Sequence, residues 1–93
     1  MKKAELERRL KNVPGWTLAA GGKRIEMILM TRRFADAIAL VNRVARLAEA
    51  HDHHPDIDIR YTRVKLSLTT HDEGGLTDRD FRMAKEINGL LAG

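Results

Sequence analysis

The sequence contains no cysteine, two prolines and few aromatic residues: one tryptophan, one tyrosine and two phenylalanines among 93 positions. Without cysteine, the protein has no disulfide framework, no thiolate metal site and no thiol nucleophile. No apolar run approaches the roughly 20 residues that span a bilayer, and the charged segment 1–7 does not have the apolar stretch of a signal peptide. We therefore expect a cytoplasmic protein with no membrane association.

Positive charge is in modest excess, because 17 Lys and Arg residues face 13 Asp and Glu residues, for a net charge of +4. A basic balance can indicate a nucleic-acid partner. However, the basic residues alternate with acidic ones, their longest clusters are pairs such as Arg32-Arg33, and the aromatic residues form no evenly spaced stacking platform. The charge pattern therefore disfavours nucleic-acid binding.

The length and the 43% apolar content suit one compact domain over residues 1–93. Hydrophobic periodicity predicts seven elements in the order α-β-β-α-β-β-α, over residues 3–11, 16–18, 25–30, 33–50, 57–61, 64–68 and, after a cap at Thr77, to about Leu91. This order predicts an α+β fold, with a single four-stranded antiparallel sheet and helices packed on one face. The segment 25–30 is apolar on both sides, which favours a second subunit covering one of them.

All four histidines of the chain lie within one short region, at positions His51, His53, His54 and His71. The first three follow the predicted helix and precede Pro55, and the last follows the predicted strand over 64–68. Histidine exchanges protons near neutral pH and also binds metals. The cluster is therefore a proton-transfer site, a metal site or an exposed loop without function.

The spacing weighs against a metal, because the zinc-binding helical motif separates its two histidines by four positions, whereas these lie one and two positions apart. In metal-free acid–base catalysis, histidines from two different elements flank a small substrate, and one accepts a proton while the other donates one. Nearby carboxylates, which include Glu49, Asp52 and Asp80, could orient the rings. An exposed polar loop without function remains an alternative on these grounds.

Glu49, His53-His54-Pro55, Tyr61, His71 and Asp80 follow one another at fixed distances, and this spaced set resembles the signature of the pterin-4a-carbinolamine dehydratases. Gly15-Trp16 and the segment 74–77 fit the family as well. The similarity extends from about Trp16 to the C-terminal helix. The resemblance implies a small α+β protein that dehydrates 4a-hydroxytetrahydropterin to quinonoid dihydropterin without any metal or organic cofactor.

The resemblance also implies a set of site residues. His53 and His71 match the family's acid–base residues at the 4a-hydroxyl and the ring N–H, and His54 would bind and orient the pterin. Further residues are implied to bind the substrate or to orient the histidines: Glu49, Asp52, Pro55, Asp80 and Trp16, the last of which is equally well explained as a core aromatic. His51 lies outside the signature, and its position suits an ordinary surface residue.

The partners implied by the resemblance are a small-molecule pterin, further copies of the chain in a homodimer or homotetramer, and an aromatic amino-acid hydroxylase that supplies the substrate. Two other hypotheses remain. Some relatives in animals act as dimerisation partners of a transcription factor, so the chain could be a coactivator-type binding module. The histidines could also form the centre of a metalloprotein.

Overall fold

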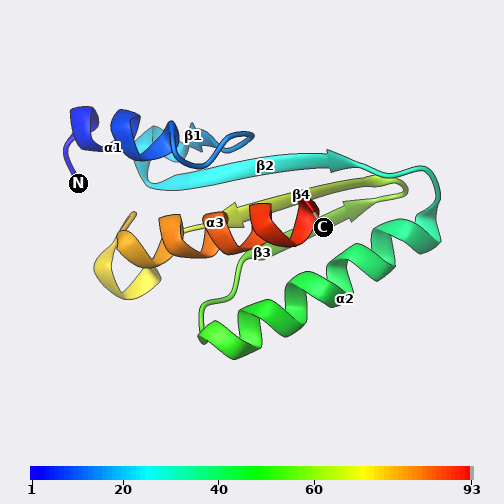
Figure 1. Ribbon diagram of the computed structural model, residues 1–93. Helices are drawn as coiled ribbons and strands as arrows, with labels where there is room; N and C mark the ends of the chain where they lie inside the picture. The colour runs from blue at the N-terminus through cyan, green and yellow to red at the C-terminus, as the bar shows by residue number, and fades with distance from the viewer. Residues whose placement is uncertain (93) are drawn as a thin grey trace.

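The computed structural model describes residues 1–92, which form three α-helices and four β-strands (Figure 1). In chain order the elements are α1 (Lys3–Leu10), β1 (Thr17–Ala19), β2 (Arg24–Met30), α2 (Phe34–His51), β3 (Asp56–Arg60), β4 (Arg63–Leu68) and α3 (Asp78–Ala92), with short 3-10 turns η1 (Ala20–Gly22) and η2 (His71–Glu73). The order of helices and strands and the single antiparallel sheet confirm the predicted α+β fold.

The four strands form one sheet in the order β1-β2-β4-β3. Met27 of β2 and Ile57 of β3 both lie opposite Leu66 of β4, so these three side chains point to the same face of the sheet. The helices pack against this face, as predicted. Ile28 and Met30 alternate with the buried residues of β2 and are exposed on the opposite face.

The core lies between this face of the sheet and the helices. Apolar residues three or four positions apart give α2 and α3 one buried side each. The helices together contribute Leu6, Ala37, Val44, Ala48, Phe81, Met83, Ala84 and Ile87 to the core. None of the helices within residues 1–92 has the length and apolar character that crossing a membrane requires.

The C-terminal boundary of β3 differs from the prediction for a clear reason. The alternation predicts a strand over 57–61, whereas β3 ends at Arg60. Tyr61 has a φ of 55°, in the left-handed region, so it leaves the extended conformation. With Thr62 it forms the two-residue turn across which Arg60 faces Arg63. A hairpin turn that carries an aromatic residue therefore has the same sequence pattern as the end of a strand.

We expect Ile87→Ala to lower the free energy of unfolding by about 2–5 kcal/mol, because Ile87 is fully buried where α3 packs on the sheet. Ile87→Val removes less of the side chain and should cost about 0.5–1.5 kcal/mol. Urea denaturation at one fixed protein concentration measures both changes. Equal, small effects of the two substitutions would contradict the packing of α3 described above.

Candidate functional site

The C-terminal end of α2 fixes the backbone that carries His53. Asp52 adopts the left-handed conformation, with a φ of 49° and a ψ of 43°. Its N–H donates to the carbonyl of Glu49, and the N–H of His53 donates to the carbonyl of Ala48. These two bonds form a Schellman motif, in which Asp52 takes the position that glycine usually occupies. The motif and the following Pro55 stop the helix and turn the chain toward β3.

The first turn of α3 is closed by a reciprocal pair of hydrogen bonds. The N–H of Arg79 donates to Oγ1 of Thr77 at 3.3 Å, and the N–H of Thr77 donates to Oδ2 of Asp80 at 2.9 Å. This is a capping box with aspartate in place of the usual glutamate or glutamine. The predicted cap at Thr77 is confirmed, and the same box places the carboxylate of Asp80.

The Asp80 carboxylate is fully buried and has three hydrogen-bond partners. Oδ1 lies 2.6 Å from Nε2 of His53, and Oδ2 accepts a hydrogen bond from the hydroxyl of Thr70 at 2.8 Å in addition to the N–H of Thr77. A buried carboxylate is costly unless its oxygens are hydrogen-bonded. These bonds offset that cost and hold the buried imidazole of His53 in one place.

His71 is presented by a closed loop that follows β4. The N–H of Thr70 donates to the carbonyl of Gly75 at 3.1 Å, and the N–H of Gly75 donates back at 3.3 Å. Gly74 has a φ of 70°, which glycine adopts at little cost. The loop thus begins at Thr70, the residue that also binds Asp80, and it carries His71 next to the end of α2.

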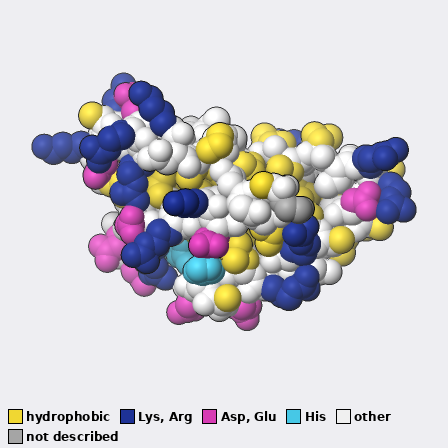
Figure 2. Space-filling model, viewed as in Figure 1, with side chains coloured by type: hydrophobic (Ala, Val, Ile, Leu, Met, Phe, Trp, Pro, Cys, Tyr) yellow, Lys and Arg dark blue, Asp and Glu magenta, His cyan; other side chains and the backbone are white. Residues whose placement is uncertain are grey.

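The two segments meet at a cavity of about 200 Å³ that contains His53, His54 and His71. The remaining residues that line it are Asp52, Thr69, Thr70, Asp72 and Arg79. Figure 2 shows histidine side chains at the surface with acidic and basic side chains close by. His53 is buried, whereas His54 and His71 are exposed. Three histidines from two distant parts of the sequence therefore share one cavity that is open to solvent.

His54 is held less firmly than His53. Its Nε2 lies 2.5 Å from Oε2 of Glu49, but both side chains are largely exposed. An exposed pair of this kind contributes about 0–1 kcal/mol. Glu49 can therefore bias the orientation of His54 without fixing it.

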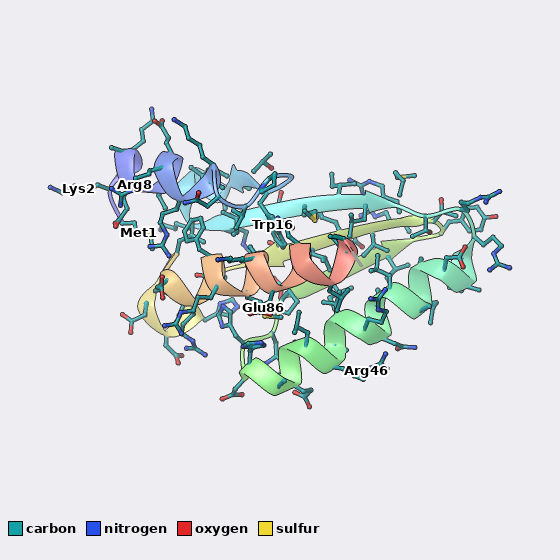
Figure 3. The ribbon with its side chains drawn as sticks, viewed as in Figure 1. Met1, Lys2, Arg8, Trp16, Arg46 and Glu86 are labelled. Atoms are coloured by element: carbon teal, nitrogen blue, oxygen red, sulfur yellow. The ribbon has the colours of Figure 1, made fainter. Side chains whose placement is uncertain are left out.

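Four of the predicted site residues do not line this cavity: Glu49 and Asp80, which contact its histidines from outside, and Pro55 and Trp16. Trp16, labelled in Figure 3, lies between β2 and α3, where it is buried and its indole N–H donates to Oδ1 of Asn88 at 2.9 Å. Asn88 in turn donates to the carbonyl of Pro14 at 3.0 Å. Pro55 lies in the turn between α2 and β3. His51 is also outside the wall of the cavity.

Thr70 and Arg79 are site residues that the sequence analysis did not single out. Arg79 donates through Nη2 to the carbonyl of Asp52 at 2.9 Å, so it links the start of α3 to the end of α2. Its position directly before Asp80 is the feature of the sequence that could have indicated Arg79 as a site residue. Thr70 stands directly before His71, which is the corresponding indication for Thr70.

The arrangement is suited to proton exchange with a small ligand. Within residues 1–92, no group of three or more His, Asp or Glu side chains is placed to hold a metal ion. A larger cavity of about 580 Å³ lies beside α1 and η1, but its lining, which includes Leu6, Leu18 and Lys23, contains no histidine. The smaller cavity is therefore the candidate active site.

Comparison with known proteins gives a consistent result. The family model described as "Pterin 4 alpha carbinolamine dehydratase" matches residues 1–90. A protein of Acidobacterium capsulatum named "Putative pterin-4-alpha-carbinolamine dehydratase" is 52% identical over 86 residues, which cover 92% of this chain and 91% of that protein. A Roseiflexus protein with the same name is 51% identical over 88 residues, 95% of this chain and 92% of its own.

Solved structures share the fold. The crystal structure of a "transcriptional coactivator/pterin dehydratase" from Brucella melitensis superposes with a TM-score of 0.89 at 31% identity, over 97% of this chain and 96% of its own. A pterin dehydratase-like protein described as a RuBisCO assembly factor in the alpha-carboxysome has a TM-score of 0.70 at 18% identity, over 85% and 92% of the two chains. The second likeness concerns the fold alone.

We expect Asp80→Ala to lower the free energy of unfolding by about 3 kcal/mol or more, because three hydrogen-bonding groups then lose their buried partner. Asp78→Ala is the matched control in the same helical turn. Asp78 is more than half exposed and forms surface ion pairs with Arg9 and Arg82, so its loss should cost about 1 kcal/mol or less. Thermal and urea denaturation check both values, and equal costs would contradict the structural role of Asp80.

Proposed function

The chain belongs to the pterin 4 alpha carbinolamine dehydratase family, and we propose that it dehydrates 4a-hydroxytetrahydrobiopterin to quinonoid dihydropterin and water. The observation that carries the proposal is the meeting of His53, His54 and His71 in one cavity, with His53 bound to a buried carboxylate. We infer that the reaction recycles a tetrahydropterin after its use by an aromatic amino-acid hydroxylase.

The proposed chemistry uses only side chains of this chain. One of His53 and His71 removes the proton from the ring N–H, and the other donates a proton to the 4a-hydroxyl. The C–O bond then breaks, a C=N bond forms and water leaves. The two histidines end with their protonation states exchanged, and solvent restores them because the cavity is open. General acid and base catalysis of this kind contributes about 10²–10⁴-fold per group.

Other residues in and around the cavity have supporting roles in this proposal. His54 binds and orients the pterin, with Glu49 biasing its ring. Asp80 positions His53, and Asp52 contributes a carboxylate and a carbonyl that holds Arg79. Pro55 shapes the turn that follows the two adjacent histidines.

We expect His53→Ala and His71→Ala each to lower kcat/KM for the dehydration by about 100-fold or more, because each removes one proton-transfer group. Loss of the carbinolamine absorbance, corrected for the uncatalysed reaction, measures the rate. His51→Ala is the matched control, since His51 is exposed and outside the cavity, and it should keep the wild-type rate.

Full activity of both variants would contradict the proposed mechanism. If the wild-type protein turns over no carbinolamine but retains a stable macromolecular partner in a pull-down, the function is that of a binding module. The name of the Brucella melitensis protein, which joins a coactivator to a dehydratase, makes that module the second candidate.

We also propose that the protein is a homo-oligomer and that β2 forms part of the contact. β1 pairs only with Arg24, Ile25 and Glu26 of β2, so within residues 1–92 the segment 27–30 has a strand neighbour on one side only. An unpaired strand edge is a template for another chain. Ile28 and Met30 lie on this segment with 53% and 68% of their surfaces exposed, and a second copy would cover them.

We expect the wild-type protein to sediment as a dimer or larger species and Ile28→Lys to shift it toward the monomer, because a charge would enter the apolar contact. Thr17→Lys is the control, since it adds the same charge to the same face of the sheet where β1 already pairs with β2. Analytical ultracentrifugation distinguishes the species. A monomeric wild-type protein, or an unchanged mass for Ile28→Lys, would contradict this contact.

A further inference from the structure

A continuous run of hydrogen bonds leads from the backbone of α3 to the imidazole of His53. The N–H of Arg79 donates to Oγ1 of Thr77, Oγ1 of Thr77 lies 2.8 Å from Oγ1 of Thr70, and Oγ1 of Thr70 lies 2.8 Å from Oδ2 of Asp80. The other oxygen of Asp80 meets Nε2 of His53. The run therefore connects a fixed backbone donor to a ring whose proton can sit on either of two nitrogens.

The donor and the acceptor of each hydrogen bond in this run follow from the groups at its two ends, the N–H of Arg79 and the carboxylate of Asp80. An ionised carboxylate has no proton, so Asp80 can only accept, and the hydroxyl of Thr70 must donate to it. Since that hydroxyl has one proton, Oγ1 of Thr70 is the acceptor toward Thr77, whose own Oγ1 accepts from the backbone N–H of Arg79. The two donors on Oδ2, Thr77 N–H and Thr70 O–H, stabilise the negative charge of the carboxylate.

We propose that Thr70 is a positioning residue that, through Asp80, fixes His53 as the tautomer with its proton on Nε2. Oδ1 of Asp80 then accepts this proton, and Nδ1 becomes the atom through which His53 exchanges protons with a ligand. The identity of the nitrogen that exchanges protons with a ligand rests on the proposed function. The tautomer of His53 is a property of the free protein and can be measured without any ligand.

The surroundings of Nδ1 agree with this assignment. In the described part of the chain, no side-chain nitrogen or oxygen is both buried and without a hydrogen-bond partner. Nδ1 of His53 makes no hydrogen bond to residues 1–92, so it is not sealed in the core, and the residue borders both the candidate cavity and a second cavity of about 110 Å³ beside His51 and Arg82. One nitrogen of the ring is thus committed to Asp80, and the other is available to a bound molecule.

Thr70 has this role in addition to a structural one. Its backbone closes the loop that carries His71, and its hydroxyl binds the acid that holds His53. The hydroxyl can be removed without changing the backbone or the shape of the side chain, because valine is close to isosteric with threonine. Thr70→Val therefore tests the bond to Asp80 while leaving the loop closure intact.

The experiment is ¹⁵N NMR of the histidine rings in the free, pterin-free protein, since protonated and unprotonated ring nitrogens have well-separated shifts. In the wild type we expect neutral His53 to have its proton on Nε2. Thr70→Val should lower the ratio of this tautomer to the Nδ1–H form by about twofold or more, because the N–H of Thr77 alone then holds Oδ2 and the carboxylate can turn Oδ1 away from Nε2. Thr70→Ser, which keeps the hydroxyl, should restore the wild-type ratio.

Ser67→Ala is the matched control, because Ser67 is as buried as Thr70 but its hydroxyl binds Arg24 on the opposite face of the sheet. It should leave the His53 signals unchanged. A wild-type His53 with its proton on Nδ1 overturns the proposal even if Thr70→Val does not fold, and so does a Thr70→Val protein with an unchanged ratio. Failure of pterin turnover would overturn the proposed function and leave the tautomer measurement intact.

Discussion

The structure around the cavity depends on the placement of one buried carboxylate, that of Asp80. Its Oδ2 closes the first turn of α3 and binds Thr70 at the end of β4, while its Oδ1 binds His53 beyond the end of α2. Three elements that are distant in the sequence are thereby joined at one residue. Because a buried carboxylate is tolerated only with its donors in place, the positions of the three elements are mutually dependent.

Most of the fold could be predicted from the sequence, because it follows from local periodicity. The apolar residues of α2 recur at helical spacing, and those of β4 alternate, so the elements and their order are evident from short windows. The exception at Tyr61 is also local, since its positive φ places an aromatic residue in a turn. Periodicity describes which side of an element is buried, and that is sufficient to derive an α+β sheet with helices on one face.

The candidate site was harder to predict, because its contacts join residues far apart in the chain. Asp80 in the first turn of α3 is explained locally as an acidic residue near a helix N-terminus, and nothing in that pattern indicates a partner 27 positions away. The sequence placed Asp80 only among several carboxylates that could orient the histidine rings, and it did not single out His53 as the partner. Thr70 did offer a physical signal: it continues the inward side of β4 after Val64, Leu66 and Leu68, and a polar residue at an inward position requires a buried partner.

The three histidines of the cavity differ in how far stability and function can be separated. His53 is bound to the same carboxylate that caps α3, so a substitution of Asp80 changes both the folding stability and the site. A loss of activity in an Asp80 variant can therefore result from unfolding or from a misplaced His53. His71 is carried by a loop that closes through backbone bonds of Thr70 and Gly75, and its own side chain is exposed. We therefore expect the replacement of His71 to leave the packed structure unchanged, so that a loss of turnover in that variant is evidence for the proposed proton transfer rather than for a folding defect.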